Sequence, residues 1–142
     1  YIRRCNIEAG LAFCPETSAS LVVKFLTQVD LLLLMTVHPG FGGQAFMPEV
    51  LEKIAFARDV CQRLRIRERG RTFETESQAS AVPPLAIQVD GGINPVTALE
   101  CAKAGATSFV AGTNVFGAVD IAGAIAALRD AAIEGEADES RH

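Results

Sequence analysis

The sequence predicts an α/β protein in which a parallel sheet is covered by helices. Short apolar runs alternate with amphipathic helical segments four times along the 142 residues, and no hairpin signal separates two runs. Such alternation implies parallel strands that are joined through helices. Hydrophobic residues make up 49% of the chain and charged residues 21%, which predicts a packed domain rather than a disordered chain.

The expected elements follow from periodicity and from helix-end signals. The expected strands are the apolar runs at residues 9–13, 31–37, 85–89 and 108–111. The run 31–37 is continuously apolar, which is typical of a strand buried on both faces. Four helices are expected. The first is capped by Thr17 or Ser18, and the second has Pro48 in its first turn. The third runs from Asn94 and Pro95 to Gly105, and the fourth carries Ile121, Ile125, Leu128 and Ala132 on one face.

Two polar segments interrupt or follow this pattern. Residues 66–84 are rich in arginine and glutamate and end in two prolines, which favours a solvated, inserted loop. Residues 134–142 form an acidic tail that is expected to fray. Residues 1–133 are therefore expected to hold the four βα units. The chain starts at Tyr1, in a segment that resembles the end of a helix, so we expect a processed chain or a fragment.

Charge and cysteine content narrow the classes of partner. The formal net charge of -4 argues against a general affinity for nucleic acid or anionic membranes. No apolar run approaches the roughly 20 residues of a membrane-spanning helix. Cys61 and Cys101 fall in helical patterns, where a small buried apolar residue is the expected role. The scattered cysteines favour a reducing compartment.

Three glycine-bearing loops follow three successive expected strands. They are residues 39–44, residues 90–92, and Gly112 with Thr113. Glycine lets backbone N–H groups approach an anion closely. Because the loops after parallel strands gather at one end of the sheet, the three loops together predict a phosphate site.

Three side chains near these loops are candidates for chemistry. Asp90 ends an expected strand and is either a turn former, a general acid/base or a metal ligand at the mouth of the sheet. His38 is a single histidine before Pro39, and without a visible partner a loop-positioning role is favoured over a catalytic one. Met35 is expected in the core.

The segment LMTVHPGFGGQ, residues 34–44, resembles the signature of the ribulose-phosphate 3-epimerases. The segments VDGGI at 89–93 and VAGTNVF at 110–116 follow in the family's order, and the resemblance extends over residues 9–128 apart from 66–84. It implies the last four βα units of a (β/α)8 barrel, a TIM barrel of the ribulose-phosphate-binding type.

The resemblance also implies an activity on a small-molecule sugar phosphate, a cytoplasmic or plastid location, and a set of site residues. The reaction would interconvert D-ribulose 5-phosphate and D-xylulose 5-phosphate by proton transfer at C3 through an enediolate, with one divalent metal ion (zinc, iron, manganese or cobalt). Asp90 would be both metal ligand and acid/base, and Met35 would lie near the sugar. The substrate-binding residues would be Gly40, Phe41, Gly42 and Gly43 over the substrate, and Gly91, Gly92, Gly112 and Thr113 at the phosphate.

The chain departs from the family in what it lacks. The family's other metal ligands, two histidines and an aspartate, and its second carboxylate come from early strands without counterparts here. We therefore expect this chain alone to bind metal poorly and to be inactive. We interpret the sequence as part of a longer enzyme that is active. Two copies of the chain could also pair into a barrel. The alternatives are an allulose-6-phosphate-type 3-epimerase and a non-catalytic half-barrel phosphate-binding module. An open doubly wound sheet is the architectural alternative, although no GxGxxG follows the first strand.

Overall fold

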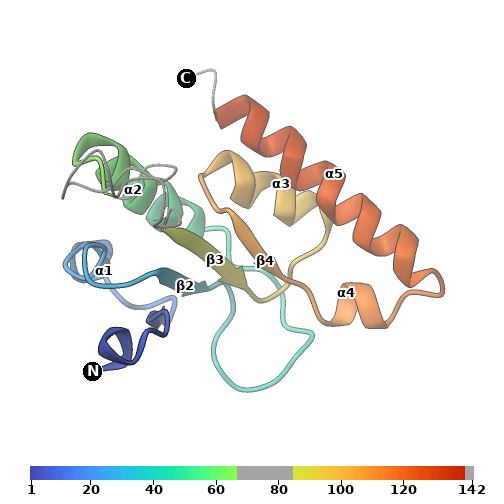
Figure 1. Ribbon diagram of the computed structural model, residues 1–142. Coiled ribbons are helices and arrows are strands. Elements are labelled where there is room, and N and C mark those ends of the chain that lie inside the picture. The colour runs from blue at the N-terminus through green and yellow to red at the C-terminus, as the bar shows by residue number, and fades with distance from the viewer. Residues whose placement is uncertain (67–84, 140–142) are drawn as a thin grey trace.

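The computed structural model describes residues 1–66 and 85–139, so most of the segment expected as an inserted loop lies outside the described residues. Helices and strands alternate along the chain (Figure 1). The elements are the 3-10 helix η1 (Ile2–Cys5), β1 (Gly10–Phe13), α1 (Ala19–Val23), β2 (Leu31–Met35), α2 (Val50–Arg63), β3 (Ala86–Asp90), α3 (Pro95–Lys103), β4 (Ser108–Val110), α4 (Thr113–Phe116) and α5 (Ile121–Glu139).

The four strands form one parallel sheet in the order β1-β2-β3-β4. Met35 at the end of β2 is in register with Asp90 at the end of β3, and Asp90 is in register with Val110. The predicted α/β class is confirmed. A doubly wound sheet reverses its strand order at a switch point, whereas this order follows the sequence, as in a barrel.

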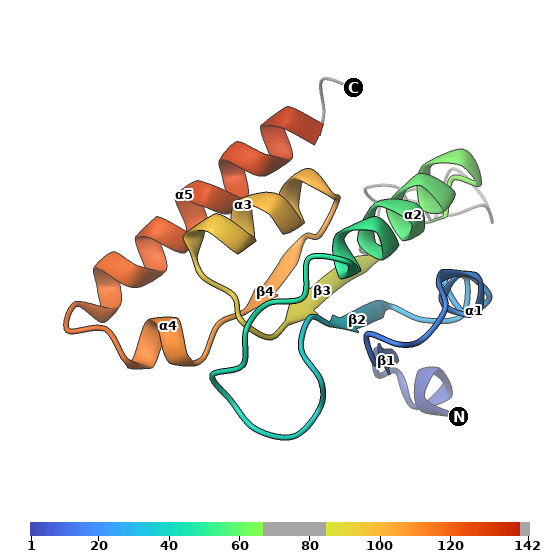
Figure 2. The ribbon, with the colours of Figure 1, turned by 180° about the vertical axis from the view of Figure 1, so that it is seen from behind.

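Within the described residues, helices cover one face of the central strands and leave the other open. Helices α2, α3 and α5 lie on the same side of the sheet in both views (Figures 1 and 2). The side chains directed toward them are almost fully buried: Leu32, Leu34, Ile87 and Val89. The alternate residues of both strands are half-exposed. The expectation of a strand buried on both faces is therefore wrong for β2, because the face that fills the interior of a closed barrel remains uncovered by four strands.

Helix α3 begins and ends where the sequence predicts. The Asn94 side chain accepts hydrogen bonds from the N–H groups of Val96 (2.9 Å) and Thr97 (3.2 Å), which satisfies two donors of the first turn. Gly105 follows the helix with φ +103°, a conformation that favours glycine. At α1, by contrast, Ser18 occupies the N-cap position without a side-chain capping bond.

Helix α5 is longer than the sequence predicts. The helix continues to Glu139. The expectation that the acidic segment frays from residue 134 is therefore wrong for residues 134–139. Two contacts with α3 hold the extension: Lys103 pairs with Asp138 at 3.0 Å, and Gly135 is buried against Leu99 and Ala102. The face that packs on the core includes Leu128 and Ala131.

Only part of the apolar face that the sequence predicts for α5 packs on the core of the described residues. Ile121 and Ile125 remain exposed, whereas Leu128, which was also expected on that face, packs on the core. The boundary of the expected insertion also moves, because Ile66 is 4% exposed and belongs to the core.

The cysteines behave as the helical pattern predicts. Cys61 and Cys101 are buried, and burial raises the pKa of both thiols, that of Cys101 to about 12. Cys5 and Cys14 are exposed, and all four thiols are free. None of the described helices is both long and apolar enough to cross a membrane.

Candidate active site

A cavity of about 560 Å³ opens at the carboxyl ends of β2, β3 and β4. The loops after these three strands line it, as expected for a parallel α/β sheet. Every residue predicted for catalysis or substrate binding lies on its wall: Gly40, Phe41, Gly42, Gly43, Asp90, Gly91, Gly92, Gly112 and Thr113. The structure thus brings the predicted residues together, while their individual roles stay predictions.

Asp90 and Met35 lie side by side at the wall of this cavity. Both are half-buried, and each is the last residue of its strand. Met35 therefore does not belong to the closed core, where the sequence placed it, but to the cavity lining. The Asp90 carboxylate has no hydrogen-bond or ion-pair partner among the described residues, so it is available to a ligand.

The two glycines after Asp90 are fixed by close packing. Gly91 has φ +125°, and a Cβ atom there would lie 2.5 Å from Cγ2 of Val37 and 2.9 Å from its backbone nitrogen. Gly92 has φ +63°, and a Cβ there would lie 2.8 Å from the backbone nitrogen of Phe46. Both positions require glycine for two reasons, a left-handed backbone and absence of space.

Two threonine hydroxyls hold this loop, and sequence reasoning missed both. Thr36 Oγ1 donates to the carbonyl of Gly91 at 2.6 Å, and Thr97 Oγ1 donates to the carbonyl of Gly92 at 3.0 Å. Thr97 also accepts from the N–H of Asn94 at 2.9 Å, which completes a reciprocal capping box. The signal for Thr97 was its spacing of three residues from Asn94; Thr36 offered no comparable signal.

Backbone N–H groups on the cavity wall are free to bind an anion. The N–H groups of Gly92, Gly112 and Thr113 donate to no acceptor among the described residues, and neither does the Thr113 hydroxyl. All three residues line the cavity. Unpaired donors on residues that line an open cavity suit the oxygens of a phosphate group.

The glycine-rich loop, defined here as residues 38–44, forms the outer wall. It leaves the sheet and swings away from the helices before the chain returns to α2 (Figures 1 and 2). The Gln44 side-chain amide braces it by donating to the carbonyls of His38 (2.7 Å) and Phe41 (2.9 Å). Phe41 is 77% exposed, so the loop tip is accessible to solvent.

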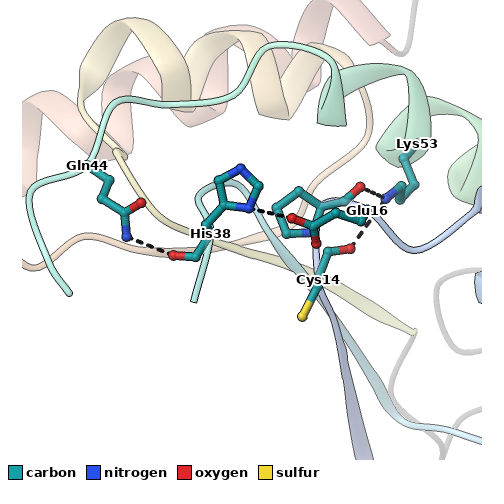
Figure 3. Close-up of polar contacts among 6 residues, drawn as sticks. Cys14, Glu16, His38, Gln44 and Lys53 are labelled. Carbon is teal, nitrogen blue, oxygen red and sulfur yellow. Dashed lines mark hydrogen bonds and ion pairs between the residues drawn. The ribbon is translucent and has the colours of Figure 1, made fainter. Parts of the chain in front are cut away.

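His38 has a partner that the sequence did not reveal. Its Nδ1 contacts Oε1 of Glu16, in the turn after β1 (Figure 3). The expectation of a histidine without a partner is therefore wrong. His38 also lines the cavity, but its Nδ1 atom is in contact with the Glu16 carboxylate.

The described residues do not by themselves form a metal site. Within residues 1–66 and 85–139, no group of three or more histidine, cysteine, aspartate or glutamate side chains is placed to hold a metal ion. Asp90 can contribute one carboxylate oxygen, whereas a stable site for a divalent ion takes several ligands.

Four sequential parallel βα units with a glycine-lined cavity at the strand ends define half of a (β/α)8 barrel. A sequence model of the ribulose-phosphate 3 epimerase family matches residues 1–116. The chain belongs to this family, as the motifs predicted.

Curated relatives carry the same family name. The ribulose-phosphate 3-epimerase of Chlamydia trachomatis serovar D is 41% identical over 116 residues, which is 82% of this chain and 43% of the relative. That of Mycobacterium leprae is 40% identical over 128 residues, 90% of this chain and 50% of the relative. The chain thus spans about half the length of the curated relatives that it matches.

Proposed function

We propose that the full-length protein containing this chain is a ribulose-phosphate 3-epimerase that interconverts D-ribulose 5-phosphate and D-xylulose 5-phosphate. The observation that carries the proposal is the free Asp90 carboxylate at the wall of a cavity that is also lined by unpaired backbone N–H groups. A carboxylate and an anion site in one cavity are what proton transfer on a sugar phosphate requires.

In this proposal Asp90 is one of two acid/base groups. Its carboxylate accepts the proton from C3 of the sugar, and the electron pair of that C–H bond moves into the C2–C3 bond as the C2 carbonyl becomes an enediolate oxygen. A second carboxylate, outside this chain, returns a proton to C3 on the opposite face. In the reverse direction the two groups exchange roles.

The phosphate is held by backbone rather than by a cationic side chain. The N–H groups of Gly92, Gly112 and Thr113 and the Thr113 hydroxyl would donate to its oxygens. Gly91 supports them by allowing the close approach of β3 to Val37. Anchoring the phosphate at this end would fix C3 relative to Asp90, since orientation of the reacting atom contributes much of the rate.

A divalent metal ion is part of the proposal, with Asp90 as the ligand from this chain. Such an ion would stabilise negative charge on the enediolate oxygens. The remaining ligands would have to come from outside the described residues, because these hold no sufficient cluster. Removing metal with a chelator and restoring zinc, iron, manganese or cobalt one at a time would test this part.

The decisive experiment measures epimerisation by the full-length product of the gene and by its Asp90→Asn variant. Asparagine keeps the shape of the side chain but cannot accept the C3 proton, so kcat should fall by about 10²–10⁴-fold. Proton NMR in D₂O follows both turnover and incorporation of deuterium at C3. Stability should change little, because the Asp90 carboxylate has no partner to lose among the described residues.

Asp120→Asn is the matched control, because it makes the same chemical change at a residue that does not line the cavity. It should leave kcat unaltered. Faster turnover of allulose 6-phosphate than of ribulose 5-phosphate would move the assignment to the six-carbon substrate. Binding of sugar phosphate without any exchange at C3 would contradict the epimerase proposal and favour a non-catalytic phosphate-binding module.

A further inference from the structure

We propose that Glu16 is a positioning residue for the glycine-rich loop, which it ties through His38 to the turn after β1. The inference rests on the proposed function, because it assigns the loop 38–44 to covering the sugar phosphate. Glu16 lies in the β1–α1 turn (residues 14–16), which does not line the cavity. It would therefore act on substrate only through the loop.

The first tether acts at the start of the loop. His38 follows β2 directly after Val37, and its ring nitrogen contacts the Glu16 carboxylate across 22 residues of sequence (Figure 3). Both side chains are 59% exposed. The pair therefore lies at the surface, where it can open and re-form without disturbing the core.

The second tether joins the start of α2, to which the chain returns after the loop, to the same turn. Lys53, in the first turns of α2, donates to the carbonyl of Pro15 at 2.6 Å and to that of Cys14 at 3.5 Å. The turn itself is closed by a hydrogen bond from the N–H of Thr17 to the carbonyl of Cys14 at 3.0 Å. Figure 3 shows the bond of Lys53 to Cys14 beside the contact of His38 with Glu16. Both ends of the excursion from β2 to α2 are thus attached to one short turn.

Glu16 is the charged centre of this arrangement. Burial lowers the pKa of the Lys53 ammonium group, and the nearby carboxylate of Glu16 acts in the opposite direction. The same carboxylate contacts His38. Removing it would release His38 and also remove a favourable charge next to Lys53.

Residues 39–43 have few constraints of their own, whereas the returning chain is held where the Met47 N–H donates to the carbonyl of Thr36 at 2.9 Å. A Cβ atom added at Gly40, Gly42 or Gly43 would meet nothing within 4 Å. Apart from the bonds of the Gln44 amide, no side-chain hydrogen bond joins residues 39–43 to the rest of the described chain. The position of the loop tip over the cavity therefore depends on how firmly its ends are held.

The test is to compare Glu16→Ala with the unaltered full-length protein in the epimerase assay. We expect KM for ribulose 5-phosphate to rise about two- to fivefold, the range that an exposed ion pair contributes, while kcat stays nearly constant. Glu16→Gln, which still accepts a hydrogen bond, should recover part of the affinity. His38→Ala should raise KM similarly, and the double variant should be no worse than either single variant.

Asp59→Ala provides the matched control, because it removes an exposed pair with Arg63 (2.7 Å) on α2 that lies outside the cavity wall. It should leave KM unchanged. A loss of kcat with constant KM in Glu16→Ala would indicate a loss of folded protein and would overturn the proposal. So would additive effects of the two single variants.

If the unaltered protein does not epimerise, the proposed function fails, and the tether is then judged by amide hydrogen exchange. In Glu16→Ala the amides of Gly40, Gly42 and Gly43 should exchange faster than in the unaltered protein, while those of β3 keep their rates. Unchanged exchange in the loop would overturn the tether independently of activity.

Discussion

The cavity has two glycine-bearing walls that use glycine for opposite reasons. After β3, a Cβ atom at Gly91 or Gly92 would come within 2.8 Å or less of a neighbouring atom. In the glycine-rich loop, a Cβ at Gly42 would meet nothing within 4 Å. The first wall is closely packed against Val37 and Phe46, and the second stands in solvent and is held at its ends.

This difference assigns different tasks to the two walls. A wall that must present Asp90 and free N–H groups at fixed positions gains from dense packing and a left-handed backbone. A wall that must admit and release a ligand gains from few contacts, since segments with low contact density open at little cost in free energy. Substitutions on the two walls should therefore affect different quantities.

The largest effect is expected for Gly91→Ala. The new methyl group would overlap Val37, and alanine would have to adopt φ +125°. Strain and overpacking each cost about 1–3 kcal/mol, so the free energy of unfolding should fall by about 3 kcal/mol. Urea denaturation of the full-length protein measures this directly.

Gly42→Ala is the matched control on the open wall. Its Cβ meets no neighbour and its backbone does not lie in the left-handed region, so stability should stay within about 0.5 kcal/mol of the unaltered protein. Equal losses at Gly91 and Gly42 would show that the distinction between a packed and an open wall is wrong.

A smaller effect is expected for Thr36→Val, which keeps the shape of the side chain. Thr36 is fully buried, and its hydroxyl donates to the carbonyl of Gly91 at 2.6 Å. Loss of this bond leaves the carbonyl without that donor, which should cost about 1–2 kcal/mol. Thr27→Val, at an exposed threonine of the α1–β2 connection, should change stability by less than about 0.5 kcal/mol in the same denaturation experiment. A neutral Thr36→Val would mean that packing alone holds the wall.

The packed wall shows what sequence reasoning could reach. Apolar runs predicted the four strands, and βα alternation predicted that their ends and loops meet at one edge, which placed Asp90 and the glycines around one cavity. The Asn94 cap could be predicted because its partners lie within the next three residues. Local signals of this kind depend on spacing, which a sequence displays directly.

Contacts between distant segments could not be predicted in this way. Thr36 and Gly91 are 55 residues apart, and the contact of His38 with Glu16 also joins two separate βα units. The length of α5 was underestimated for the same reason, because the polar segment after residue 134 is held by Lys103 of another helix. Such partners become visible only when packing brings their elements together.

The smallest effect on stability is expected for Gln44→Ala on the open wall. The two bonds from Gln44 to the carbonyls of His38 and Phe41 are exposed, so their loss should cost about 0.5 kcal/mol or less in urea denaturation. Amide hydrogen exchange at Gly40 and Gly43 should nevertheless accelerate severalfold, because local opening of the loop does not require unfolding of the sheet. Gln28→Ala removes a comparable exposed bond, to the carbonyl of Lys24 at 3.1 Å, and should leave exchange in the loop unchanged. If Gln44→Ala instead lowered global stability as much as Thr36→Val, the glycine-rich loop would be part of the packed fold, and the contrast between the two walls would disappear.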